Sequence, residues 1–98
     1  MSYKQIVKED QRLVVLRGLH DMQGYSANDS IIQTVLEQYG HRISRDQVRT
    51  HLSWLDEQGL ITIETIGETS VATLTGSGAD AATGRSTVAG IKRPAPKG

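Results

Sequence analysis

The 98-residue chain contains no cysteine, only two prolines and no long apolar run. Without cysteine, neither a disulfide framework nor a thiolate zinc site is possible, a composition that fits an intracellular protein. No apolar stretch approaches the roughly 20 residues that a membrane-spanning helix requires, and the N-terminus lacks the layout of a signal peptide. We therefore expect one small cytoplasmic domain with no membrane partner.

Residue patterns that support catalysis or metal binding are also missing. The three histidines, His20, His41 and His51, do not have the spacing of metal ligands, and we expect His51 to lie at the surface or at the edge of the core. The serines have no plausible triad partner, and residues 76–78 are too short for a phosphate-binding loop. The sequence therefore predicts no enzyme, no metal and no cofactor.

The 11 basic and 11 acidic residues balance overall, but each sign of charge is missing from one part of the chain. The balance argues against strong non-specific binding to nucleic acid. Residues 50–84 contain no lysine or arginine, whereas residues 85–98 contain no aspartate or glutamate. Positive charge is therefore expected at the start of the third helix and in the C-terminal tail, with an acidic segment between them.

Apolar residues with helical spacing fill the first 40 positions. Residues 3–22 have one apolar and one charged face, which predicts a first helix. A capping box at Ser26 predicts a second helix that runs to about Tyr39 and stops at Gly40. The apolar faces consist of Ile6, Leu13, Leu16 and Leu19 in the first helix, and of Ile31, Ile32, Val35 and Leu36 in the second.

The third helix, expected from Ser44 to Gln58, has the clearest limits. Ser44 and Gln47 are spaced as a capping box, and Gly59 supplies the left-handed residue with which many helices end. Val48, Leu52 and Leu55 follow at i, i+4 and i+7 and form one apolar stripe. A helix that follows another after a tight glycine-containing turn is typical of the helix-turn-helix motif.

The periodicity changes to that of strands after the third helix. Residues 60–66 and 70–75 predict two antiparallel strands joined at Gly67. A short alanine-rich helix around residues 79–83 is expected after them. Three helices and a hairpin predict a mainly α fold of the α+β class, a winged helix-turn-helix with a two-stranded wing. We expect this domain to span residues 1–84 and a flexible basic tail to span residues 85–98.

Polar and cationic residues occupy the spare face of the third helix. Such side chains reach base edges and phosphates from the major groove, so we interpret this helix as a candidate recognition helix for double-stranded DNA. The alternative is a solvated helix face whose arginines pair weakly with Asp46 and Asp56. The candidate DNA-binding residues are Arg42, Ser44, Arg45, Gln47, Arg49, Thr50 and Ser53.

The predicted wing departs from a DNA-docking hairpin because it is acidic. Glu68 lies at its turn and Glu64 is close by, and both would be repelled by phosphates. Either the wing points away from DNA, or the domain is a protein-interaction module whose acidic wing meets a basic partner. The basic tail is the other candidate for phosphate contacts.

Self-association is a further expectation for so small a chain. The first helix has more apolar surface than one neighbouring helix covers, and Val7, Val14, Val15 and Met22 are the candidate contacts of a homodimer. Trp54 lies beside the apolar stripe of the third helix. It is expected at the edge of the core, with a dimer contact as the alternative.

Two segments of the chain resemble the winged helix-turn-helix superfamily of bacterial regulators. The shared pattern has a third helix that ends in Leu-x-x-Leu-x-x-x-Gly-Leu-Ile and, after a hairpin, a Leu-Thr-x-x-Gly segment. In this sequence the pattern falls on Leu52, Leu55, Gly59, Leu60, Ile61, Leu74, Thr75 and Gly78. The resemblance implies a third helix that enters the major groove and a protein that commonly dimerises.

The chain as a whole also looks like small winged-helix proteins of Mu-like prophages. That narrower resemblance implies a phage-derived transcriptional regulator. Together with the residue patterns it leads to one functional expectation, sequence-specific binding of double-stranded DNA, with the protein-interaction module as the alternative.

Overall fold

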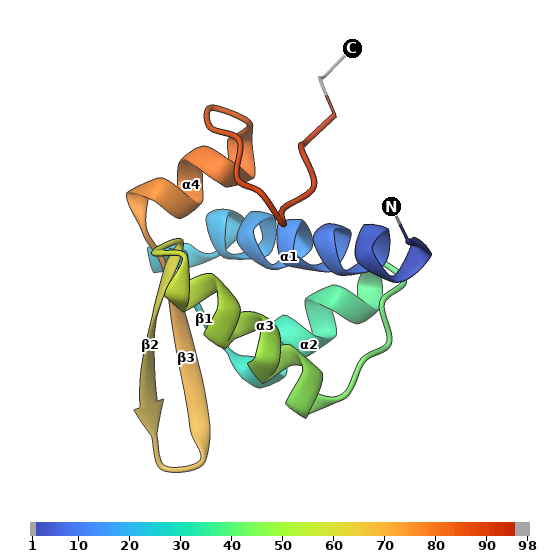
Figure 1. Cartoon of the computed structure of the whole chain (residues 1–98). Helices are drawn as coiled ribbons and strands as arrows, with labels where there is room; N and C mark the ends of the chain where they lie inside the picture. Colours follow the sequence, from blue (N-terminus) through green and yellow to red (C-terminus); the bar gives the residue numbers. More distant parts are fainter. Residues whose placement is uncertain (1, 96–98) are drawn as a thin grey trace.

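Residues 2–95 are described by the computed structural model, and they form an α+β fold (Figure 1). The chain begins with the long helix α1 (Tyr3–Asp21), a single 3₁₀ turn η1 (Gln23–Tyr25) and the short strand β1 (Ser26–Asn28). Helices α2 (Asp29–Gln38) and α3 (Arg45–Glu57) follow. The hairpin consists of β2 (Ile61–Ile66) and β3 (Thr69–Leu74), and α4 (Gly76–Thr83) comes after it. This order is compatible with the predicted winged helix-turn-helix.

The antiparallel sheet has three strands in the order β1-β3-β2, one more than the sequence predicts. Ser26 was expected to cap the second helix, and that expectation is wrong. The backbone of Ser26 pairs with Thr73, and its hydroxyl donates to the carbonyl oxygen of Ala72 at 3.1 Å. The cap is Asn28, whose side-chain oxygen accepts from the backbone N–H of Ile31 at 2.9 Å. Helix α2 therefore begins directly where β1 ends.

The predicted limits of α3 are confirmed. Ser44 accepts from the backbone N–H of Gln47 at 3.1 Å, and the side chain of Gln47 accepts from the backbone N–H of Ser44 at 3.0 Å. At the other end, Gly59 has φ = +74°, and the N–H of Leu60 donates to the carbonyl of Leu55. Because Gly59 turns the chain sharply, β2 runs back along the core and the hairpin extends beside α3 (Figure 1).

The Leu-Thr-x-x-Gly segment joins the hairpin to α4 by close packing. The hydroxyl of Thr75 accepts from the N–H of Gly78 at 3.1 Å and donates to the carbonyl oxygen of Gly59 at 2.7 Å. Gly78 lies so close to the backbone of Leu60 that a Cβ atom there would collide with the Leu60 carbonyl oxygen. The motif thus fixes the start of α4 against the end of α3.

One hydrophobic core joins all the helices and the sheet. Leu16, Leu36, Val48 and Leu55 are fully buried at its centre. Val14 and Val15, which were expected to contact a second copy, are buried within the single chain instead. Of the remaining candidates for a dimer contact, Met22 packs against the core and Val7 is half-buried.

Residues 85–95, here called the C-terminal segment, pack back against α1. Ile91 is buried, the N–H of Lys92 donates to the carbonyl of Glu9, and the carbonyl of Gly90 accepts from Arg12 Nη1 at 3.0 Å. The expectation of a flexible tail did not anticipate these contacts, and its last three residues lie outside the described part of the chain. The described segment belongs structurally to the domain that was expected to end at residue 84.

Trp54 and His51 of α3 both pack toward α1. Trp54 is half-buried at the edge of the core, as expected, with the guanidinium carbon of Arg12 4.0 Å from the centre of its ring. His51 is buried, so the expectation of a surface or edge position is wrong. Its Nε2 lies 2.8 Å from Oε1 of Gln11, another buried polar side chain.

Candidate nucleic-acid interface

Helix α3 lies at the surface of the molecule and shows its polar side to solvent (Figure 1). Val48, Leu52 and Leu55 hold the opposite side in the core. The link between α2 and α3 is fixed by Gln33, whose side-chain nitrogen donates to the carbonyl of Ile43 at 3.0 Å. The orientation of α3 relative to α2 is therefore set by apolar contacts below and by a hydrogen bond at the link.

A buried carboxylate stands behind the two arginines of this helix. Asp29, the first residue of α2, has a side chain that is only 2% exposed. Its Oδ2 accepts from Nε of Arg49 at 2.9 Å, and its Oδ1 lies 3.9 Å from Nη1 of Arg45. The arginine side chains themselves remain 42–43% exposed. One negative charge therefore holds two positive charges from below, and the net charge presented outward is positive.

The environment of Asp29 keeps its carboxyl group ionised. Burial by itself raises the pKa of this group, but the hydrogen bond and charge of Arg49, the backbone N–H of Ser70 and the charge of Arg45 outweigh it. The pKa of Asp29 is consequently below its ordinary value. The three contacts also connect α2, α3 and β3 at one point.

The two arginines differ in what their outer ends do. Nε of Arg45 donates to Oε1 of Gln33 at 2.9 Å, so the guanidinium is anchored along its inner edge. Arg49 is held at both edges, because its Nη2 donates to the carbonyl oxygen of Glu68 at 2.7 Å. Glu68 lies at the turn of the hairpin, so Arg49 ties the hairpin tip to α3.

The other candidate residues differ in how exposed they are and in the hydrogen bonds they make. Arg42 is 87% exposed, with Nε 3.9 Å from a Glu37 carboxylate oxygen. The side chains of Ser44 and Gln47 are used in the helix cap, and the hydroxyl of Thr50 donates to the carbonyl of Asp46 at 3.0 Å. Ser53 is exposed. Arg45, Arg49 and Ser53 follow at four-residue intervals along one side of α3. The side chains of Ser44, Gln47 and Thr50 already have hydrogen bonds to neighbours in sequence.

Sequence reasoning missed Asp29 and Gln33. Asp46 and Asp56 were the partners only in the alternative interpretation of a solvated helix face, and the ion pairs are made to Asp29 instead. The only signal at position 29 is an acidic residue in the first turn of a helix, which is common because it suits the helix dipole. Its contact with α3 depends on how the two helices cross.

Two further classes of site were tested on residues 2–95. No group of three or more histidine, aspartate or glutamate side chains in this range could hold a metal ion. None of the helices in the same range is both long and apolar enough to cross a bilayer.

Comparison with known proteins gives one relative that covers almost the whole chain. The uncharacterized protein gp26 of Escherichia phage Mu is 51% identical over 92 residues, which is 94% of this chain and 95% of gp26. The chain belongs to the gp26 family. No protein-family model matches it.

A bacterial protein is similar to this chain over a shorter stretch. An uncharacterized protein of Haemophilus influenzae is 66% identical over 64 residues, which is 65% of this chain and 62% of that protein. The similarity to gp26 supports the link to Mu-like phages that the sequence resemblance implied.

Proposed function

We propose that this gp26-family protein is a winged helix-turn-helix protein that binds double-stranded DNA sequence-specifically and regulates phage or prophage genes. Helix α3 would lie in the major groove. The observation that carries the proposal is the pair Arg45 and Arg49, exposed on one helix face and both held from behind by the buried carboxylate of Asp29. Arginines that are oriented in advance lose less side-chain entropy when they bind a base edge or a phosphate.

The positions of the other candidate residues support the same docking. Arg42 precedes the helix and projects into solvent, where a phosphate of the groove wall would lie. Ser53 is one turn further along α3 from Arg49 and has its hydroxyl free for a base edge or a phosphate. In this arrangement Arg45 is the strongest candidate for base readout, because the outer edge of its guanidinium faces solvent.

The hairpin has a different task in this proposal. Its carboxylates Glu64 and Glu68 are exposed and would be repelled by DNA, so the hairpin supports α3 instead of docking on phosphates. Arg49 transmits that support through its bond to the Glu68 carbonyl oxygen. Arg49 is therefore expected both to contact DNA and to position the hairpin.

The test begins with selection of bound duplexes from a random library, followed by fluorescence anisotropy on the selected sequence across a salt series. Arg45→Ala should weaken binding to the selected duplex by about 1–3 kcal/mol and relax preference at one base position. Arg42→Ala should weaken binding to all duplexes alike and reduce the salt slope by about 1. Glu57→Gln, at the far end of α3, is the matched control and should bind like the wild type.

Arg49 needs two variants because it has two tasks. Arg49→Ala should lower affinity by about 1–3 kcal/mol. Arg49→Lys keeps the charge but cannot hold Asp29 and Glu68 together, so it should recover the salt dependence and not the base preference. Failure to enrich any sequence, or no binding even at low salt, would reject the proposed function.

A further inference from the structure

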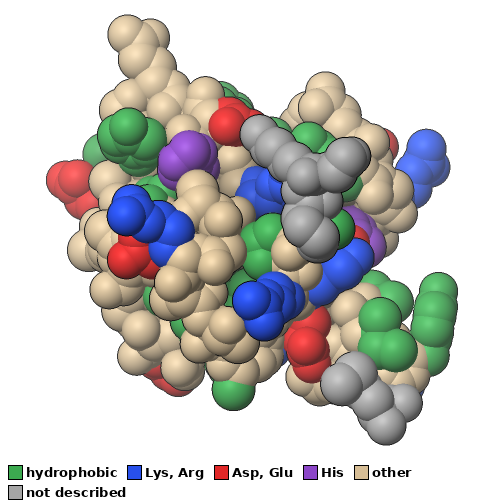
Figure 2. All heavy atoms as spheres, turned by 90° about the horizontal axis from the view of Figure 1, so that it is seen from above, with side chains coloured by type: hydrophobic (Ala, Val, Ile, Leu, Met, Phe, Trp, Pro, Cys, Tyr) green, Lys and Arg blue, Asp and Glu red, His purple; other side chains and the backbone are tan. Residues whose placement is uncertain are grey.

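A groove lies on the other side of the molecule, between the second half of α1, the end of α4 and the C-terminal segment. Its volume is about 870 Å³, within the range of about 300–1,000 Å³ that is usual for binding pockets. Figure 2 views this side, and Lys and Arg side chains lie across the middle of it. The groove is remote from α3 and plays no part in the proposed contact with DNA.

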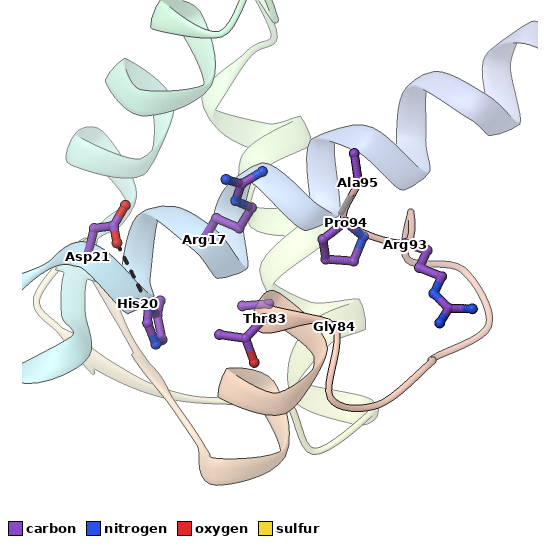
Figure 3. A pocket seen from close by; sticks show the side chains of 9 residues that line it. Arg17, His20, Asp21, Thr83, Gly84, Arg93, Pro94 and Ala95 are labelled. Carbon is purple, nitrogen blue, oxygen red and sulfur yellow. Dashed lines mark ion pairs between the residues drawn. The ribbon is translucent and has the colours of Figure 1, made fainter. Parts of the chain in front are cut away.

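Two arginines give the groove its charge. Figure 3 shows Arg17 from α1 and Arg93 from the C-terminal segment on opposite sides of Pro94. Within residues 2–95, neither side chain makes an ion pair. The one carboxylate in the lining, Asp21, lies 3.7 Å from Nδ1 of His20. The groove therefore has two arginines on either side of Pro94 against one carboxylate, an excess of positive charge.

The hairpin tip has the complementary pattern. Glu64 and Ile66 share the outer face of β2, about 7 Å apart, since residues two positions apart in a strand point the same way. Glu68 follows at the turn, and all three side chains are exposed, Ile66 by 60%. An exposed isoleucine between two carboxylates matches a proline between two arginines in both polarity and charge. One cation reaches the tip, Arg49, whose Nη2 donates to the backbone carbonyl oxygen of Glu68. The carboxylates of Glu64 and Glu68 remain exposed and make no ion pair within residues 2–95.

The hairpin cannot reach the groove of its own chain. In Figure 1 the hairpin extends downward from the core, whereas α4 and the C-terminal segment lie above α1. The longest dimension of the molecule is 40 Å, against 27 and 24 Å in the other directions. A tip that fits the groove must therefore come from another molecule.

We propose that the hairpin tip of one copy docks in the Arg17–Arg93 groove of the next copy. The two surfaces are different patches, so the contact is heterologous, and each molecule has one of each. Such contacts build head-to-tail rings or open chains. The groove side of this contact is separate from the proposed DNA interface, whereas the hairpin side is bonded to Arg49 of α3 through the Glu68 carbonyl oxygen. The groove variant is therefore the one that distinguishes self-association from DNA binding.

Sedimentation velocity across a wide range of protein concentration, at low and high salt, tests the contact. The wild type should form larger species as concentration rises, and high salt should reduce them because the exposed charges are screened. Glu64→Gln/Glu68→Gln and Arg17→Gln/Arg93→Gln should each weaken self-association by about ten-fold. Glu57→Gln and Lys4→Gln, exposed charges away from both surfaces, are the controls and should associate like the wild type.

Mixing the two double variants gives the sharpest test. The hairpin variant keeps an intact groove, and the groove variant keeps an intact hairpin, so the mixture should form a one-to-one heterodimer that does not grow further. A wild type that stays monomeric overturns the proposal and leaves the groove to another acidic partner. A dimer that neither double variant weakens also overturns it, because it would be built on a different, symmetric surface. Anisotropy on DNA with the groove variant keeps this result separate from the proposed function.

Discussion

At the scale of single residues, the buried side chain of Asp29 connects three elements on the α3 side of the molecule. It accepts from Arg49, lies near Arg45 and receives the backbone N–H of Ser70. A buried carboxylate is stable only when such partners compensate for the loss of water. Its removal should therefore affect both the stability of the fold and the orientation of the two arginines.

Asp29→Asn should lower the free energy of unfolding by about 2 kcal/mol, because the charge-assisted bond to Arg49 is replaced by a weaker one and the two guanidinium groups repel each other. Urea denaturation monitored by circular dichroism measures the change. Asp56→Asn, an exposed residue of α3, is the control and should stay within about 0.5 kcal/mol of the wild type. Equal stability of the two variants would contradict the structural role of Asp29.

His51 predicts a specific loss of stability in acid. Burial, with the charges of Arg12, Lys8 and His41, lowers the pKa of His51 to about 4, against 6.5 for an ordinary histidine. Between these values the unfolded chain binds a proton that the folded chain does not, so stability falls as the pH drops from 6.5 towards 4. For this residue alone we expect a loss of about 2 kcal/mol between pH 7 and pH 5.

The measurement is urea denaturation at both pH values. The His51→Gln variant should lose about 2 kcal/mol less unfolding free energy than the wild type between pH 7 and pH 5, whatever its stability at pH 7. His20→Gln changes a histidine whose side chain is 41% exposed and serves as the control. A wild type and His51→Gln with the same pH dependence would show that the pKa of His51 is not lowered by folding.

Local residue preferences were predictable, and contacts between distant residues were not. The capping box of Ser44 and Gln47 and the left-handed Gly59 depend on neighbours within four positions, so the sequence contains the whole pattern. Arg49 and Asp29 are 20 residues apart, and their contact depends on the crossing of α2 and α3. His51 was misplaced for the same reason, because its partner Gln11 is 40 positions away.

At the scale of elements, the start of α4 is the most constrained junction. Gly78→Ala should destabilise the protein by about 3 kcal/mol, because the new methyl group would collide with the Leu60 carbonyl and with Leu74. Gly76→Ala, in the same helical turn, has nothing within 4 Å of its added Cβ atom. It should be neutral or stabilise by about 0.5 kcal/mol. Thermal denaturation of the pair checks the prediction, and similar melting temperatures would refute the close packing.

The helices and the hairpin were predictable because each has a periodicity of its own over at least six residues. Strand β1 has three residues, too few for alternation to show, and Ser26 and Asn28 are both good helix caps. It forms by pairing with β3, whose residues lie 43 to 47 positions later in the chain. For this reason the residues of β1 were predicted to begin a helix.

At the scale of the whole molecule, the C-terminal segment completes the core. Ile91→Ala should destabilise the fold by about 2 kcal/mol. This value is at the lower end of the range for a buried isoleucine, because Ile91 lies at the edge of the core and is slightly exposed. It should also shift the fluorescence of Trp54 to longer wavelength, since the segment that shields the ring loosens. Ser86→Ala, an exposed change in the same segment, should do neither. An unshifted spectrum in Ile91→Ala would argue against this packing.

The composition of residues 85–95 explains why their packing was missed. Glycine, proline and scattered basic residues are common in mobile tails, and only one large apolar side chain of this segment, Ile91, is buried. The decisive contact joins Arg12 to Gly90 across 78 positions. The ion pair of Lys92 with Asp10, at 3.3 Å, is equally remote in sequence.

The stacking of Arg12 on Trp54 under Gly90 has a consequence for synthesis of the chain. A ribosome makes residues 12 and 54 well before residues 90–92, so the helices can assemble while the ring of Trp54 is still open to water on that side. The aromatic face closes only after the last of these residues has left the exit tunnel. During that interval the part of the Trp54 ring that Gly90 approaches in the finished protein is exposed to water.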